Sequence, residues 1–463
     1  MRRFLLALVL AAGGLAAGWH FLKHRSATAE AAGLPLDIWF TCETNGRIEP
    51  CGCFSGQYGG LTRVSTVLAS VPRPGLKLEI GNAIAGGEDY HILQFRYLLE
   101  AQGRLGYAAL NLGSREASLS AESLRSLAKD SPVPLISANV LDAATRRPVV
   151  EPWRVVETGG LRVGVIGVVH SSRTEPHKSV HIEDAFEALR RVIPAVKEGS
   201  DLLVCMAFTD ESGLAGIARA FYELPIILGG DVRQPSQSLE RVNQSWILAT
   251  TNESRALGEL HTSWNPRTKS LGPVTGEITL MRDSIPEDPV IAAFSSDYRR
   301  EVRSTKLDID RPRTDQDLIP GVEPSASYLG SEACAGCHPS AYASWSKTQH
   351  AHAFDSLVRK DSDADPSCIA CHVVGFGEPG GYQRSLKGER LVHVGCESCH
   401  GPGSEHVTAR VSVAPGEEVF QKMRPVGPGF CVQCHHGEFS RPFRYDAFWP
   451  LIEHGKEVKA GGD

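Results

Sequence analysis

The stretch Gly395-Cys396-Glu397-Ser398-Cys399-His400-Gly401 contains the pattern that decides how the last third of the chain folds. Two cysteines are separated by two residues, and a histidine follows the second cysteine directly. The same pattern recurs as Cys334-Ala-Gly-Cys337-His338, Cys368-Ile-Ala-Cys371-His372 and Cys431-Val-Gln-Cys434-His435. Four copies so close together indicate one repeated chemical role rather than a chance spacing.

This spacing is typical of covalent haem attachment. The two thiols bond to the vinyl groups of one haem, and the adjacent histidine then lies under the iron as its proximal ligand. A single motif could also bind zinc, but four in succession favour haem. We therefore predict four covalently bound haem c groups, held by Cys334, Cys337, Cys368, Cys371, Cys396, Cys399, Cys431 and Cys434, with proximal ligands His338, His372, His400 and His435.

So short a segment with four haems leaves little room for a conventional side-chain core. We expect the porphyrins to supply most of the buried apolar area, and the chain around them to form short helices and irregular loops. The second, distal ligands of the irons must come from other histidines, since a second imidazole gives the six-coordinate iron that suits electron transfer. Candidates are His350, His406, His393 and His454, with His352 and His436 as weaker ones.

This region resembles the cytochrome c554-type multihaem family. The resemblance rests on Tyr328-Leu-Gly-Ser-Glu-Ala-Cys-Ala-Gly-Cys-His, on Trp345-Ser-Lys-Thr-Gln-His350 and on Gly395-Cys-Glu-Ser-Cys-His-Gly-Pro-Gly-Ser-Glu-His406. It implies haems packed in close pairs, mostly with two histidine ligands, in proteins that carry electrons or act on small molecules. Carried over by position, it makes His350 and His406 the best distal ligands, with His393 and His454 next. The tetrahaem domain is predicted over 326–463.

The N-terminus has the features of an export signal. Met1-Arg2-Arg3 precedes an apolar run from Phe4 to about Leu22, which is followed by small residues that suit signal cleavage. The run is also almost long enough to span a bilayer, so an uncleaved inner-membrane anchor is the alternative. We expect 1–32 to be a signal peptide or anchor and the rest of the chain to lie in the periplasm.

Between these ends, apolar strand-like runs alternate with helical stretches over 33–282, as in Arg162-Val-Gly-Val-Ile-Gly-Val-Val and Ala185 to Val196. This alternation predicts a layered α/β domain. The stretch 283–325 is expected to be a helix and linker to the cytochrome domain. The net charge of −6 gives no basic surface for nucleic acid, so nucleic-acid binding is not expected.

The order of these pieces resembles the 5'-nucleotidase branch of the metallophosphoesterases. The resemblance rests on Thr41-Cys-Glu-Thr-Asn-Gly-Arg, Gly81-Asn82, Tyr107-Ala-Ala-Leu-Asn-Leu-Gly-Ser-Arg-Glu and Ile226-Ile-Leu-Gly-Gly-Asp-Val-Arg. It implies a site for two metal ions, but most ligand positions have changed. They hold Glu43, Asn45, Asn82, Ser114, Arg115, Phe208, Asp231 and Arg233. Two-metal catalysis needs several anionic or imidazole ligands, so we expect the fold to be kept and the hydrolase to be lost.

Four cysteines lie outside the haem motifs: Cys42, Cys51, Cys53 and Cys205. Three of them fall in the loop after the first predicted strand, where the resembling family builds its active site. The alternatives are a structural disulfide from Cys42 to Cys51 or Cys53, a redox-active Cys51-Gly-Cys53 dithiol, and a cysteine-bound metal.

The predicted function is electron transfer by an exported tetrahaem cytochrome, with redox partner proteins in the periplasm or membrane. One alternative is a multihaem oxidoreductase that reduces a small sulfur, selenium or nitrogen compound, at an open haem or at the cysteine loop. The other is a residual metal-dependent phosphoesterase.

Overall fold

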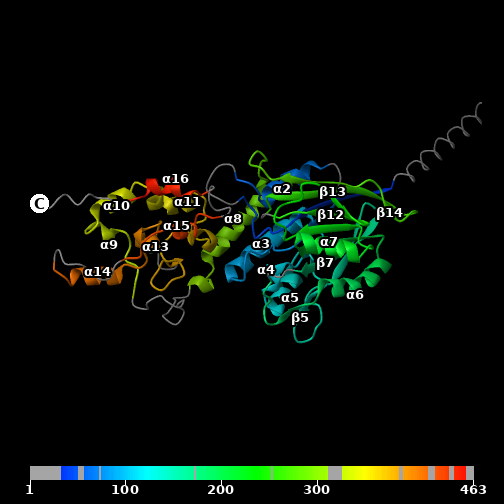
Figure 1. The fold of residues 1–463 in the computed structure, drawn as a ribbon, viewed down its shortest axis with the longest axis horizontal. Coiled ribbons are helices and arrows are strands. Elements are labelled where there is room, and N and C mark those ends of the chain that lie inside the picture. Colours follow the sequence, from blue (N-terminus) through cyan, green and yellow to red (C-terminus); the bar gives the residue numbers. More distant parts are fainter. Residues whose placement is uncertain are drawn as a thin grey trace, which may run out of the picture. The chain divides into compact units, whose positions relative to one another are not determined.

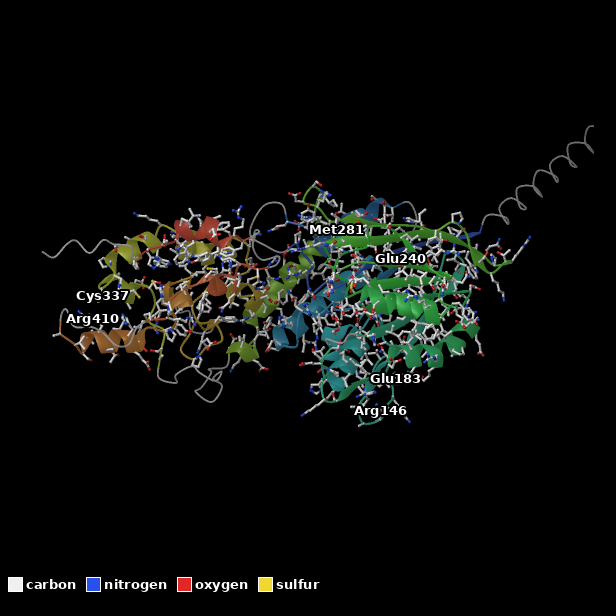
Figure 2. All side chains as sticks on the ribbon, in the orientation of Figure 1. Arg146, Glu183, Glu240, Met281, Cys337 and Arg410 are labelled. Carbon is white, nitrogen blue, oxygen red and sulfur yellow. The ribbon has the colours of Figure 1, made fainter. Side chains whose placement is uncertain are left out.

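The protein is described from a computed structural model, which covers 33–50, 57–71, 75–170, 174–251, 254–310, 326–384, 389–414, 423–436 and 443–454. The predicted signal or anchor (1–32) lies outside the described residues, as do Cys51 and Cys53. The chain divides into two compact units. The first holds 58–87, 95–291 and the N-terminal part to Glu49, and the second holds 50–57, 88–94 and 292–463 (Figure 1). Side chains of the described residues fill the space between the elements within each unit (Figure 2).

The first unit contains two large sheets. One has the order β14-β13-β1-β2-β3-β4, with β15 also paired to β13, and the other has the order β11-β12-β10-β9-β7-β6. Strands of the first sheet are β1 (Leu34–Thr41), β2 (Leu76–Glu79), β3 (Ala109–Asn111), β4 (Leu135–Ile136), β13 (Ala256–Asn265), β14 (Ser270–Leu271) and β15 (Thr275–Leu280). Strands of the second are β6 (Trp153–Thr158), β7 (Leu161–His170), β9 (Leu202–Thr209), β10 (Ile226–Gly230), β11 (Glu240–Val242) and β12 (Ser245–Ala249). A separate pair joins β5 (Val140–Asp142) to β8 (Val180–Ile182).

The central strands of both sheets run parallel: β1, β2, β3 and β4 in one, and β7, β9, β10 and β12 in the other. Their continuous apolar sequences fit this position, because a strand in a parallel sheet is covered on both faces. All eight residues of β9 are buried. The helices of this unit are α2 (Leu61–Ser70), α3 (Asp89–Leu105) from Phe95 onward, α4 (Ser114–Ala117), α5 (Ala121–Asp130), α6 (Ala185–Glu198) and α7 (Glu211–Ala220).

Helices α6 and α7 cover one face of the second sheet, with which they share an apolar core. The opposite face of that sheet meets the first sheet. Asn111, at the end of β3, donates from its Nδ2 to the carbonyl oxygen of Ile80 at 2.8 Å and to that of Val168, in β7, at 3.0 Å. The ends of parallel strands from both sheets therefore come together at one edge. This layered α/β unit confirms the predicted fold class.

The second unit contains short helices and irregular segments, as predicted. Its helices from the first haem motif onward are α9 (Glu332–Ala335), α10 (Pro339–Trp345), α11 (Ala353–Arg359), α12 (Pro366–Ile369), α13 (Cys396–His400), α14 (Ser404–Val411), α15 (Pro428–Cys431) and α16 (Tyr445–Phe448). One small side-chain core is buried there, made of Leu357, Ile369, Val373, Val374, Tyr382 and Leu391. No helix within the described ranges combines the length and apolar character needed to cross a membrane.

Helix α8 (Pro289–Ser304) occupies part of the stretch expected to join the two domains. From Ala292 onward it belongs to the second unit. Arg384 holds its end in place, because the guanidinium donates to the carbonyl oxygens of Val302 and Thr305, at 2.9 and 3.0 Å, and to that of Ala364 at 2.9 Å. Arg384 also forms a buried ion pair with Asp310 at 3.1 Å.

Candidate functional site

His338, His372 and His435 each follow a short helix, whereas His400 is the last residue of α13. The backbone N–H of His338 donates to the carbonyl oxygen of Cys334 at 2.9 Å, and that of His435 donates to Cys431 at 2.8 Å. In His372 and His400 the Nδ1 atoms lie 2.7 and 3.0 Å from backbone carbonyl oxygens. A hydrogen bond from Nδ1–H to a carbonyl leaves Nε2 free to bind iron.

Three motif histidines each face a second histidine. The ring centres are 6.2 Å apart for His338 and His406, 5.9 Å for His435 and His350, and 6.1 Å for His400 and His454. Two imidazoles that bind one iron from opposite sides have ring centres about 6 Å apart, because each metal–nitrogen bond is about 2 Å long. The observed spacing therefore fits an iron between the rings of each pair.

Burial supports the same role for several of these rings. It lowers the pKa of His350, His372, His400 and His435 below the usual value for histidine. A lowered pKa keeps the imidazole neutral at physiological pH, and the neutral ring is the form that binds a metal.

His372 differs from the other motif histidines. It forms no ring pair with another histidine within the described ranges. The nearby candidate His393 instead faces His352, at 6.3 Å between ring centres. Nδ1 of His393 accepts a hydrogen bond from the backbone N–H of Phe354 at 3.2 Å. In a neutral ring the proton is then on Nε2, which leaves no nitrogen lone pair for iron.

The cysteines show which motifs are neighbours. Cys334 of the first motif is hydrogen-bonded to Cys396 of the third, and this contact lowers the pKa of Cys396 to about 6. Cys371 of the second motif is hydrogen-bonded to Cys434 of the fourth, which lowers the pKa of Cys371 to about 7. The first motif therefore lies beside the third and the second beside the fourth, and Cys399 of the third motif also lies close to Cys431 of the fourth.

Glu397, inside the third motif, is a structural residue that the sequence analysis does not predict. It is 3% exposed and accepts hydrogen bonds from three backbone N–H groups: Leu329 at 3.0 Å, and Gly330 and Gly403 at 2.7 Å each. One carboxylate thus joins the segment before the first motif to the segment after the third. Only the folded chain brings these three amides together, so no local pattern could have revealed the contact.

The edge where the two sheets meet holds the positions at which the sequence analysis expects replaced metal ligands. Glu43, Asn45, Asn82 and Asp231 all have positive φ, between 51° and 61°. Such a conformation is costly for residues other than glycine and is often kept at functional sites. The strand ends of this edge therefore contain unusual backbone turns.

These side chains bond to one another. The guanidinium of Arg115 donates to Oδ1 of Asn45, the backbone N–H of Arg115 donates to Oδ1 of Asn82 at 2.8 Å, and Thr251 donates to Glu43. Phe208 is fully buried, and its ring lies near Gly81. Among the residues that the structure describes, no group of three or more His, Cys, Asp and Glu side chains could hold a metal ion.

Two buried carboxyl groups lie beneath this edge. Oε2 of Glu79 accepts hydrogen bonds from Thr41 and Thr44, both at 2.6 Å, and from Gln102 at 3.0 Å. Burial raises the pKa of Glu79 to about 7. Burial also raises the pKa of Glu116, which accepts from backbone N–H groups including that of Gly113 at 2.8 Å.

Of the cysteines outside the motifs, Cys42 and Cys205 are free thiols, and both are fully buried. Cys42 lies at the edge, where a Cβ atom added to Gly230 would be 2.3 Å from its sulfur. Cys205 belongs instead to the core under α6 and α7. Burial raises the pKa of both thiols, to about 12 for Cys205. Both groups are therefore protonated, and a protonated thiol is a poor nucleophile.

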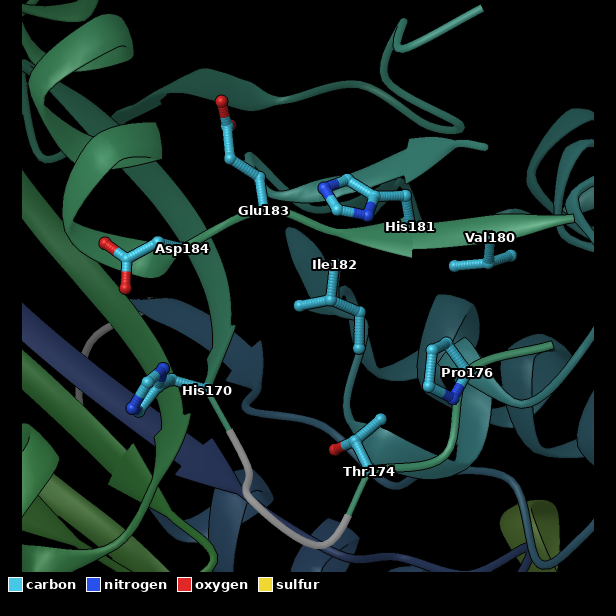
Figure 3. Close-up of a pocket in the computed structure, with 8 residues that line it drawn as sticks. All are labelled: His170, Thr174, Pro176, Val180, His181, Ile182, Glu183 and Asp184. Atoms are coloured by element: carbon cyan, nitrogen blue, oxygen red, sulfur yellow. The ribbon is translucent and has the colours of Figure 1, made fainter. Parts of the chain in front are cut away.

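A pocket in the first unit opens beside the end of β7. It measures about 440 Å³ and is lined by His170, Thr174, Pro176, Val180, His181, Ile182, Glu183 and Asp184 (Figure 3). The two acidic residues already have partners there. Asp184 caps α6, and Glu183 forms an ion pair with Arg191.

Comparison with known proteins separates the two halves of the chain. The family model for cytochrome c554 and c-prime matches 333–401. Cytochrome c-554 of Nitrosomonas europaea is 40% identical over 93 residues, which cover 17% of this chain and 40% of that protein. The C-terminal half carries a cytochrome c554-type domain. The four motif histidines and the ring pairs described above are the parts of this cytochrome domain that fit haem c.

The N-terminal half is similar to 5'-nucleotidases. A probable 5'-nucleotidase of Treponema pallidum is 26% identical over 183 residues, which cover 38% of this chain and 31% of that protein. The solved structure of the calcineurin-like phosphoesterase YfkN of Bacillus subtilis superposes with a TM-score of 0.51 at 16% identity, over 58% of this chain and 98% of that one. The chain spans less than half the length of both sequence relatives. Its first unit has the 5'-nucleotidase-like α/β fold, joined here to a c-type cytochrome.

Proposed function

We propose that this chain is an exported tetrahaem c-type cytochrome that carries electrons between redox partners in the periplasm or at the membrane. The observation that carries this proposal is the set of three histidine pairs at 5.9 to 6.2 Å, each containing one motif histidine. An iron with two imidazole ligands changes little in geometry on reduction, so it gains and loses an electron readily.

In this proposal each paired iron has an identified distal ligand. His406 serves the haem of the first motif, His454 that of the third and His350 that of the fourth. The close contacts between the first and third motifs, and between the second and fourth, favour a relay in which electrons pass within and then between two haem pairs.

The test is a count of haem and of electrons on the purified full-length protein. Pyridine haemochrome spectra should give four haems per chain, and a reductive titration followed by haem absorbance should show four one-electron haem reductions that reverse on reoxidation. Three haems or fewer, or zinc in their place, would contradict the proposal.

A second candidate function is reduction of a small sulfur, selenium or nitrogen compound at the second haem. It is favoured by His372, whose ring has no histidine partner within the described ranges. An iron with one open side can bind a small ligand. Titration of the reduced protein with carbon monoxide should then saturate at one molecule for every four haems, and no binding at all would exclude an open haem.

For the first unit we propose that phosphoester hydrolysis has been lost. Arg115 brings positive charge to a position where the resembling family binds cations, and its bonds to Asn45 and Asn82 occupy two further ligand positions. Release of phosphate from nucleoside monophosphates in the presence of Mn²⁺ or Mg²⁺ should remain at the level of the buffer blank. Metal-dependent turnover that follows the protein through purification would contradict this proposal.

We keep Cys51 and Cys53 as the proposed redox dithiol, since Cys42 and Cys205 are buried thiols with raised pKa. Thiol titration of the holoprotein should find two fast-reacting groups after mild reduction, and the double variant C51S/C53S should lose them. Two reactive thiols that survive in this variant would disprove the dithiol.

The N-terminal segment 1–32 is proposed to export the chain and either to be cleaved or to anchor it in the inner membrane. Fractionation of expressing cells, followed by N-terminal sequencing, separates these two outcomes. Recovery in the cytoplasm with all four haems attached would contradict export.

A further inference from the structure

A buried tyrosine and a buried aspartate meet beside the second haem motif. The hydroxyl of Tyr298, in α8, donates to Oδ1 of Asp365 at 3.1 Å. Tyr298 is 3% exposed and Asp365 is 6% exposed. Asp365 also caps α12 by accepting from the backbone N–H of Ser367 at 2.9 Å, and α12 carries Cys368, the first cysteine of that motif.

The groups around Asp365 leave its charge only partly balanced. Burial raises its pKa, while the hydrogen bonds from Ser367 and Tyr298, and the charge of Arg299, act in the opposite direction. Tyr298 also faces Cys368 and Tyr90, and Tyr90 lies close to Glu88 and Asp89. Cys368 becomes an uncharged thioether once haem is attached. Asp365 is therefore a carboxyl group in a low-dielectric site, where a nearby change of charge acts strongly.

Reduction of a haem is such a change, because the ferric iron gains one electron. A new negative charge nearby favours the protonated form of a carboxyl group. Asp365 is three residues from Cys368, at the N-cap of α12, and α8 brings Tyr298 to it. The resemblance to multihaem cytochromes covers 333–401 in the family model, whereas Tyr298 lies outside that range.

We propose that Asp365, held by Tyr298, binds one proton when the haem of the second motif accepts one electron. This inference rests on the proposed function, since it requires that haem to be present. The electron comes from a one-electron donor such as a reduced carrier protein, and the iron goes from ferric to ferrous. The proton comes from water and forms an O–H bond on the Asp365 carboxylate, and both leave on reoxidation. The reduced second haem would thus have a proton available on Asp365. Reductions that consume protons as well as electrons need such a proton.

The test is a redox titration of the holoprotein by absorbance at a series of pH values from 5 to 9. In the wild type, one of the four potentials should fall as pH rises, by up to about 59 mV per pH unit for one proton per electron. Asp365→Asn should remove this slope from that haem and leave the other three potentials unchanged. Asp361→Asn is the matched control, because Asp361 is an exposed aspartate in the same segment between α11 and α12. The potentials of this variant should change with pH as those of the wild type do.

Tyr298→Phe provides a second test that does not remove the carboxyl group. The hydroxyl of Tyr298 favours the ionised carboxylate, so its loss should move the pH-dependent range to higher pH. An Asp365→Asn protein with four haems and the wild-type slope would overturn the proposal alone. A wild-type protein without haem at the second motif would overturn the proposed function together with it, and the haem count distinguishes the two results.

Discussion

The rings of His338 and His406 lie with their centres 6.2 Å apart, although they come from the first motif and from α14 after the third. If one iron sits between them, His406→Ala removes its distal ligand. We expect one further haem to change from low spin to high spin, visible as a larger high-spin signal than that of the wild type in the EPR spectrum of the oxidised protein.

The control for this variant is His352→Ala. His352 faces His393 and not a motif histidine, and its side chain is 61% exposed. Its loss should leave the spectrum unchanged. A high-spin fraction in His406→Ala that equals that of the wild type, or the same increase in both variants, would remove His406 as a ligand.

The carboxylate of Glu397 binds three backbone N–H groups from two segments. Glu397→Ala leaves these groups buried without an acceptor, and each costs about 1 kcal/mol or more. We expect the free energy of unfolding to fall by about 3 kcal/mol, as measured by urea unfolding followed through haem absorbance. Glu332→Gln, a change of an exposed glutamate in α9, should stay within about 0.5 kcal/mol of the wild type. Equal stability of both variants would contradict the role given to Glu397.

Glu79 should make the first unit less stable as pH rises. Its pKa is raised to about 7 in the folded chain, so the folded state holds the proton more tightly than the unfolded state does. The stability that this proton contributes is fully present below 4.5, the usual pKa of glutamate, and is lost as pH rises to about 7. The loss amounts to about 3 kcal/mol, since one pKa unit is worth about 1.4 kcal/mol.

Glu79→Gln removes this titration. Relative to the wild type, we expect the variant to gain about 3 kcal/mol between pH 4 and pH 8 in urea unfolding followed by circular dichroism. Glu157→Gln, at an exposed position of β6, should keep the pH profile of the wild type. Parallel profiles for Glu79→Gln and the wild type would show that Glu79 does not titrate in this range.

Arg384 and Arg303 both connect α8 to the loops around the second motif. The side chain of Arg384 is largely buried, whereas that of Arg303 is exposed to solvent. Arg384 is 9% exposed and binds Asp310 and three carbonyl oxygens, whereas Arg303 is 41% exposed and binds Asp361 and Asp363. Arg384→Ala should cost about 3 kcal/mol, because it leaves a buried charge without its partner. Arg303→Ala should cost about 1 kcal/mol or less. Urea unfolding of the two variants decides the order, and a larger loss for Arg303→Ala would contradict it.

The haem motifs could be predicted from the sequence because their chemistry is local. Cysteines three positions apart and an adjacent histidine define the site by themselves, and no distant residue is needed. The distal ligands are different, since His435 meets His350 only after the chain has folded. By position in the sequence alone, His393 is as good a candidate for a distal ligand as His454. The orientation of its ring, fixed by the backbone N–H of Phe354, has no signature in the sequence.

In the first unit the sequence predicted the alternating strands and helices, because continuous apolar runs such as β7 fit only covered strands. It did not predict that Arg115 would bond to Asn45 and Asn82, nor that Glu79 would be buried among Thr41, Thr44 and Gln102. These contacts join strands and loops that are distant in sequence, so local patterns carry no information about them.

The most direct test of the account is quantitative EPR of the oxidised wild-type protein. Three haems with two histidine ligands and one with His372 alone predict three low-spin signals and one high-spin signal in equal amounts. Four low-spin haems would contradict an open site at the second haem. Electron transfer would then be the one proposed function that remains. Two or more high-spin haems would contradict the histidine pairs on which the account rests.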